Sequence, residues 1–195
     1  MTKALIFAAA ALSLQAAGLT EADKREGLAQ LERTRAAVID ATKGLSEAQW
    51  KFKPAPDRWS VAECVEHIVL VEGYLFDSTA KTVMKGPAPK PDRDLKRIDS
   101  FVLTGIADRT QKAKAPEPVT PKGLTSPAET LDRFLKLRGE TIAFLQSTQG
   151  LRDHVGDSPL GQPLDAYQFL LFISAHSDRH TKQILEVKAD PNFPK

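Results

Sequence analysis

Two histidines stand four residues apart near the end of the chain, at His176 and His180. Both belong to an apolar helical face, because residues three and four apart lie side by side on a helix. The other members of this face are Phe169, Ile173 and Ile184. An apolar helical face normally turns towards a core, so both imidazoles should point inward. Either each ring has its own hydrogen-bond partner, or the two rings share a metal ion.

A third histidine, His67, lies on a second apolar stripe with Cys64, Val71 and Tyr74, beside Ile68 and Leu75. Alone, it would be interpreted as a core residue with a backbone partner. Helical bundles, however, build metal sites from side chains that converge from facing helices. Three imidazoles with an open fourth position form a catalytic rather than a closed structural site. Both Zn²⁺ and Ni²⁺ suit imidazole ligands, and the sequence does not rank them.

Other catalytic patterns find no support in the sequence. The zinc-protease motif needs Glu directly after the first histidine, where this chain has Ser177. There is no Gly-x-Ser-x-Gly turn and no phosphate-binding glycine loop. Among the nearby acidic residues, Glu63 caps a helix, and we interpret Glu66 and Asp178 as solvated or capping charges. His154 falls in a predicted loop and is interpreted as a surface residue. No general base stands out, so the catalytic residues stay unassigned.

The elements that would position these histidines are helices. A cap at Thr20 opens the first, and capping boxes at Ser60 and Ser126 open two more. A last helix is expected over 164–187, and a helical crossover over 92–114. The linker 45–59 carries both tryptophans, which we expect to pack over the end of the bundle. β-branched residues form no alternating runs, so the sequence predicts an all-α fold, an antiparallel four-helix bundle with long loops.

Composition limits the classes of protein that this chain could represent. Its 195 residues fit one domain, which we place at 19–190 with a loose tail at 191–195. A net charge of +2, without a basic stripe interleaved with aromatic residues, argues against nucleic-acid binding. Cys64 is the only cysteine, which excludes an intramolecular disulfide and a multi-cysteine metal site. The sequence allows a homodimer without predicting one.

The first 18 residues have the pattern of a secretory signal peptide. Lys3 precedes an apolar run over 4–14, and small residues follow at 16–18. The run is shorter than the roughly 20 residues that span a bilayer, so we expect no stable membrane anchor. The alternative is an alanine-rich first turn of the first helix. We therefore expect a periplasmic or secreted protein that begins near Leu19, or a cytoplasmic one if the N-terminus is not cleaved.

Two segments resemble the DinB-like superfamily. One is Trp59-Ser-Val-Ala-Glu-Cys-Val-Glu-His67-Ile68, and the other runs from Tyr167 to Ile184 and contains His176-Ser-Asp-Arg-His180. The resemblance covers roughly residues 20–187. It implies a four-helix bundle with a three-histidine metal site at His67, His176 and His180, often holding nickel or zinc. Family activities include metal-dependent hydrolysis and transfer of low-molecular-weight thiols to electrophiles. An exported chain would differ from the usual cytoplasmic members, whose thiol cosubstrate is cytoplasmic.

Three functions are compatible with these observations. The first is a metal-dependent hydrolase or thiol transferase that acts on a small molecule. The second is a helical bundle that binds the metal or a ligand without catalysis. The third is a structural bundle whose histidines are core residues. Metal analysis separates the third from the others, and a substrate screen separates the first from the second.

Overall fold

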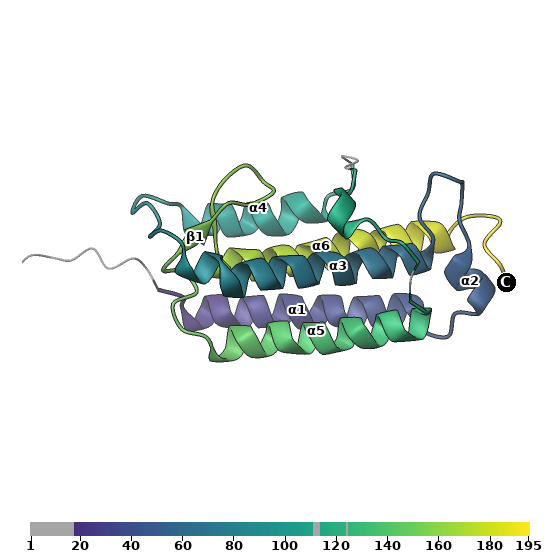
Figure 1. Cartoon of the computed structure of the whole chain (residues 1–195), viewed down its shortest axis with the longest axis horizontal. Coiled ribbons are helices and arrows are strands. Elements are labelled where there is room, and N and C mark those ends of the chain that lie inside the picture. The colour runs from purple at the N-terminus through teal and green to yellow at the C-terminus, as the bar shows by residue number, and fades with distance from the viewer. Residues whose placement is uncertain (1–17, 111–113, 124) are drawn as a thin grey trace, which may run out of the picture.

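A bundle of four long helices forms the body of the molecule and confirms the predicted all-α fold (Figure 1). The computed structural model describes residues 18–110, 114–123 and 125–195. Helices α1 and α6 run in one direction along the bundle, and α3 and α5 run in the other. The bounds of the four are α1 Glu21–Thr42, α3 Val61–Lys81, α5 Pro127–Ser147 and α6 Ala166–Lys188.

Shorter elements occupy the connections between these helices. Helix α4 lies along α6 and accounts for the helical crossover that the sequence predicts. Helix α2 is a single short helix in the linker that carries the tryptophans, where we predicted no helix. The strands β1 and β2 form one antiparallel pair of two residues each. The bounds are α2 Glu47–Lys51, η1 Val83–Lys85, α4 Leu95–Ala107, η2 Glu117–Val119, β1 Val155–Gly156 and β2 Leu164–Asp165.

Side-chain caps fix where most of the helices begin. Ser60 and Ser126 each accept a hydrogen bond from the backbone N–H three residues on, and the glutamate at that position bonds back to the cap. The predicted capping boxes are thus confirmed. Equivalent boxes open α1 at Thr20, α2 at Ser46 and α6 at Asp165. A capping side chain stabilises a helix by about 1 kcal/mol.

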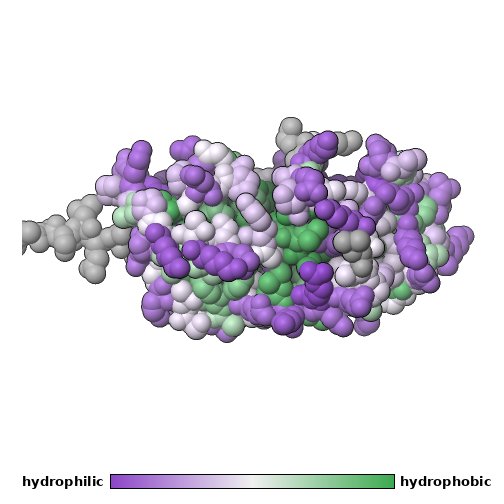
Figure 2. All heavy atoms as spheres, in the orientation of Figure 1, coloured by the Kyte–Doolittle hydropathy of each residue, from purple (hydrophilic) through white to green (hydrophobic). Residues whose placement is uncertain are grey.

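Helix α6 is the central element of the core. Every residue from Ala166 to Ala175 is buried, because α1, α3 and α4 all pack around this helix. On α3 the buried stripe includes Cys64, His67 and Val71 as predicted, but Tyr74 is 60% exposed. Leu75 is buried in its place, since the helical period of 3.6 residues rotates the stripe past position 74. Figure 2 shows mostly hydrophilic side chains on one face, with an apolar band across its middle.

A buried ion pair joins all four long helices. Arg138 of α5 and Glu72 of α3 are 0% and 1% exposed, and two hydrogen bonds of 2.8 Å link them. The other N–H groups of Arg138 donate to Leu31 O and Thr34 Oγ1 of α1 and to Ser177 Oγ of α6. All five guanidinium donors are therefore used, which is the condition for burying this charge without a large penalty.

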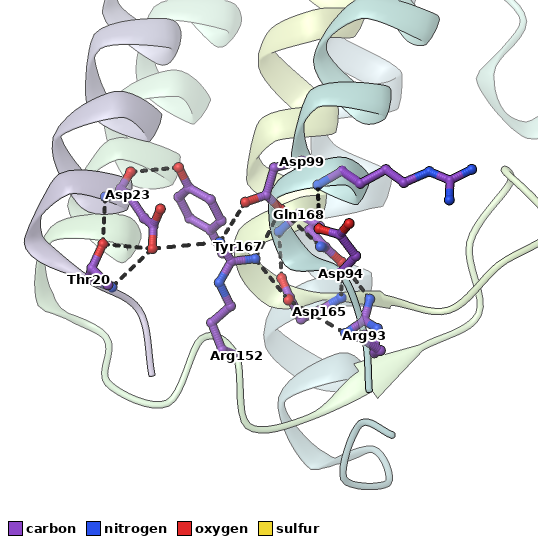
Figure 3. A network of polar contacts seen from close by, with 10 residues as sticks. Thr20, Asp23, Arg93, Asp94, Asp99, Arg152, Asp165, Tyr167 and Gln168 are labelled. Carbon is purple, nitrogen blue, oxygen red and sulfur yellow. Dashed lines mark hydrogen bonds and ion pairs between the residues drawn. The ribbon is translucent and has the colours of Figure 1, made fainter. Parts of the chain in front are cut away.

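A second polar network lies at the end of the bundle where α1 and α6 begin (Figure 3). Arg152 donates to Asp99 of α4 and to the buried Asp165 that caps α6. Burial alone would lower the pKa of Arg152, but these two carboxylates raise it. The Arg152 guanidinium also lies 4.4 Å from the ring of Tyr167, whose hydroxyl donates to Asp23 O. The network ties the 148–165 loop to α1, α4 and α6.

Both chain ends were subjects of sequence predictions. The predicted signal peptide, residues 1–18, lies outside the described residues except for Gly18, so it stays a prediction. Among the helices that the structure describes, none combines the length and apolar character needed to cross a bilayer. At the other end, the Phe193 ring packs edge-on against Phe52 at 5.5 Å, and Gln49 donates to Pro194 O. The C-terminal segment thus contacts the region of α2.

Candidate metal centre

The structure brings together the three histidines that the sequence singles out. His67 comes from α3, and His176 and His180 come from successive turns of α6. One nitrogen of each ring lies within 4.8 Å of one nitrogen of the other two. His67 and His180 are 4% and 7% exposed, and His176 is partly buried. Among the described residues this is the only group of three histidine, cysteine or acidic side chains arranged closely enough to hold one ion.

The orientation of the His67 ring is set by a backbone carbonyl. Its Nδ1 lies 2.6 Å from Val119 O, in the short helix η2. A carbonyl oxygen only accepts, so Nδ1 carries the proton and Nε2 keeps a free lone pair. Metal-binding histidines commonly hold their second ring nitrogen in this way.

The His180 ring is oriented by a side-chain relay. Its Nδ1 lies 2.9 Å from Gln183 Oε1, and Arg109 Nη1 donates to the same oxygen at 3.2 Å. A guanidinium only donates, so the atom that faces it must be the amide oxygen, and His180 Nδ1 must also be a donor. Glu186 holds Arg109 in turn through two bonds of 2.7 Å. Nε2 of His180 is left as the nitrogen available to a metal ion.

The distance between the first two rings fits a shared ion. His67 Nε2 and His176 Nε2 are 3.2 Å apart. Two nitrogens bound at 2.0–2.1 Å in tetrahedral geometry would be separated by about 3.3 Å. Without an ion, His176 Nε2–H must donate to His67 Nε2, because the proton of His67 is on Nδ1. If that proton moves to Nδ1 of His176, the ring stays neutral and Nε2 of each of the three rings offers a lone pair to one cation, so the donor set fits a divalent metal.

The protein environment keeps these imidazoles neutral. Burial lowers the pKa of His67, opposed by its bond to Val119. Burial lowers the pKa of His176 well below its usual range, and the neighbouring His180 and His67 add to the effect. The pKa of His180 falls to about 3, again mainly because the ring is buried. Neutral imidazole is the form that binds metals, so the rings are in that form at neutral pH.

Trp59 forms an aromatic wall beside the histidines. Its ring centroid lies 4.7 Å from that of His67 and 5.9 Å from that of His180. Both linker tryptophans also pack over the bundle end, as expected. Trp50 lies in the cluster with Val61, Cys64 and Val65, and Trp59 packs against this cluster. Trp59 directly precedes the cap of α3, and its position two turns before His67 was the available signal.

The remaining polar residues near the motifs have structural partners. Glu63 completes the capping box as predicted. Asp178 forms ion pairs with Arg33 and Lys182 at 3.1 and 3.0 Å, so the solvated interpretation was too simple. His154 bonds through Nδ1 to Gly86 O, away from the three-histidine group, and is half-buried rather than a free surface residue.

Glu66 was also interpreted as a solvated or capping charge, and it is only partly buried. Its carboxylate accepts hydrogen bonds from the backbone N–H groups of Lys122 and Gly123. Gln183 and Val119 were not identified from the sequence. Gln183 is one helical turn after His180, which is a usable signal. The partner of His67 is a backbone carbonyl, which any residue type could supply.

Comparison with known proteins finds related sequences and a related fold. The family model described as the DinB superfamily matches residues 30–184 of the chain. The uncharacterized protein YuaE of Bacillus subtilis (strain 168) is 29% identical over 148 residues, which make up 75% of this chain and 87% of that protein.

A solved structure shows the same fold. It is YfiT from Bacillus subtilis, described as "a probable metal-dependent hydrolase with an unusual four-helix bundle topology". The two structures superpose with a TM-score of 0.57 over 90% of this chain and 91% of that one. Their sequence identity is 16%, so this likeness concerns the fold alone.

Proposed function

The chain belongs to the DinB superfamily, and its three convergent histidines lead us to propose that it is a divalent-metal-dependent enzyme acting on a small molecule. The reaction is a hydrolysis or the transfer of a thiol to an electrophile. The observation that carries the proposal is the 3.2 Å approach of His67 Nε2 to His176 Nε2, with His180 beside them. A hydrogen bond between two core histidines would account for that one contact, but it does not account for a third ring nitrogen within 4.8 Å of both.

The residues of this chain have distinct tasks in the proposal. His67, His176 and His180 hold the ion, and Zn²⁺ or Ni²⁺ suits three imidazoles. Val119 O and Gln183 Oε1 fix the tautomers of two of these rings. When bound, the ion supplies Lewis-acid polarisation of a substrate oxygen and makes a water molecule or a thiol more acidic.

Three imidazoles leave the charge of a divalent ion uncompensated, since the ligand group within the described residues contains no carboxylate or thiolate. The Trp59 ring lies beside two of the three imidazoles. A nucleophile that loses a proton, such as water or a thiol, would complement the remaining charge. This supports hydrolysis or thiol transfer.

The second candidate is a bundle that binds the metal, or a ligand through it, without catalysis. The absence of a carboxylate or thiolate from the histidine group favours this candidate too, because the group then provides no general base of its own. A screen with ester, amide and electrophile-plus-thiol substrates tests the choice. Turnover should appear in protein loaded with Zn²⁺ or Ni²⁺ and disappear after chelation. Stoichiometric metal without turnover in any arm would favour the binding protein.

A further inference from the structure

Two adjacent side chains of α3 hold the same crossing segment. His67 donates through Nδ1 to Val119 O at 2.6 Å. Next to it, the Glu66 carboxylate accepts from Lys122 N at 3.0 Å and from Gly123 N at 2.8 Å. The attachment points on the segment 114–123 are thus three to four residues apart. Helix α3 fixes both the carbonyl that orients His67 and the chain just beyond it.

The attachment at Glu66 is suited to a carboxylate. Each of its two oxygens receives a backbone N–H, and hydrogen bonds to a charged acceptor are about twice as strong as neutral ones. Gly123 has a φ of +66°, which glycine adopts without steric cost. The two N–H groups belong to consecutive residues, so one carboxylate reaches both. Glu66 is only partly buried, so a general role in the core does not explain it.

The residues between the two attachments are held firmly enough to couple the position of Lys122 to that of Val119. Val119 is 8% exposed and packs in the main apolar core cluster. Thr120 N donates to Glu117 O, and Pro121 restricts the backbone just before Lys122. Figure 1 shows the chain passing from η2 across the bundle to the start of α5. Displacement at Lys122 would therefore be felt at Val119.

The geometry points to Glu66 as a positioning residue for the candidate metal centre. By docking Lys122 and Gly123, it holds Val119 O where that carbonyl fixes the tautomer and orientation of His67. The effect on metal binding rests on the proposed function, whereas the effect on the His67 ring does not. Glu66 itself contacts neither the ion nor a substrate.

The test compares Glu66→Ala and Glu66→Gln with the matched control Glu117→Ala. Glu117 is a carboxylate of the same segment, is 78% exposed and pairs only with the Lys122 side chain among the described ion pairs. Zn²⁺ affinity, measured by competition with a chromophoric chelator, should fall about tenfold in Glu66→Ala, the lower end of the range for outer-shell partners. Glu66→Gln keeps one acceptor oxygen and should lie between, while Glu117→Ala should match the wild type.

A second measurement uses metal-free protein. Long-range ¹H–¹⁵N NMR should show His67 in the Nδ1–H form in the wild type and in Glu117→Ala, and a mixture of tautomers in Glu66→Ala. An unchanged tautomer in Glu66→Ala would overturn the positioning role. Unchanged Zn²⁺ affinity in that variant would overturn its relevance to the metal while the proposed function stands. A wild type that binds no Zn²⁺ or Ni²⁺ would instead overturn the proposed function, and the NMR result would then decide the positioning role alone.

Discussion

Arg138 Nη2 donates to Ser177 Oγ at 2.8 Å, and Ser177 directly follows His176 in the chain. The buried ion pair in the bundle is therefore attached to the helix that carries two of the three histidines. The other residue of this ion pair, Glu72, lies on α3 little more than one turn after His67. The same network that joins the helices also sets how α3 and α6 face each other near the candidate metal centre.

Breaking this pair from one side should be costly. Arg138→Met leaves the Glu72 carboxylate buried without its partner, which should lower the free energy of unfolding by about 3–5 kcal/mol. In the double variant Arg138→Met/Glu72→Leu no charge is left behind, so much of the loss should be recovered. Urea denaturation of the three proteins measures both effects. Lys81→Met, at an exposed pair with Asp77, is the control and should barely change stability. A double variant as unstable as the single one would contradict this account.

Replacing one histidine should separate the proposed ligands from the other histidine of the chain. His176→Ala removes one of three donors and should reduce bound Zn²⁺ or Ni²⁺ strongly, while His154→Ala should leave it unchanged, because His154 bonds to Gly86 O elsewhere. The fold should survive, since the bundle has its own apolar core. Elemental analysis after identical dialysis of protein without a histidine tag provides the measurement. Equal metal content in wild type and His176→Ala would place any ion elsewhere.

The hydrogen bond between His180 and Gln183 predicts that a change at Gln183 lowers metal affinity less than the loss of a histidine ligand does. Gln183→Leu removes the acceptor of His180 Nδ1–H, so the ring can turn and change tautomer. Metal affinity should fall by about 10–100-fold, as is typical for outer-shell partners. Gln183→Glu keeps an acceptor and should bind at least as tightly as the wild type. Isothermal titration with Zn²⁺ tests this, with Gln30→Leu on α1 as the control. Equal loss in both leucine variants would point to a general effect of the substitution.

Metal-free protein should lose stability in mild acid. The three histidines have a lowered pKa in the folded state, reaching about 3 for His180, whereas the unfolded chain takes up protons near the ordinary value of 6.5. The unfolded state then binds more protons below pH 6.5, so the stabilisation is complete above that pH and is lost as the pH falls. Each histidine contributes a slope of at most about 1.4 kcal/mol per pH unit.

Urea denaturation between pH 7.5 and 5 tests this prediction, because most carboxylates titrate below that window. The variant His180→Asn should show a shallower dependence than the wild type. Identical slopes for the two proteins would mean that His180 is as easily protonated in the folded state as in the unfolded chain.

Much of the fold follows from local signals in the sequence. The capping boxes at Ser60 and Ser126 are short local motifs, and each identifies the start of a helix. Apolar periodicity identifies the buried faces of α3 and α6. The histidine group was predictable for the same reason, together with the family resemblance. Tyr74 shows the limit of periodicity, since one position of rotation decides between core and solvent. Helix α2 is too short to produce a periodic signal.

Long-range polar contacts were not predictable in this way. Arg138 and Glu72 are 66 residues apart, and neither stands out from the other charged residues of its helix. The two N–H groups that Glu66 binds belong to the backbone, as does the carbonyl that orients His67. Such partners depend on how the 114–123 segment crosses the bundle, which the residue types do not reveal.

The approach of His67 to His176 joins positions 109 residues apart. An ion held by both would close a loop of that length in a chain whose single cysteine offers no intramolecular disulfide. For a loop of about 100 residues, the chain-entropy estimate for a covalent cross-link is roughly 4.7 kcal/mol. The metal would then act as a reversible staple between the two halves of the sequence, and a chelator would act on this protein as a reductant acts on a disulfide-bonded one.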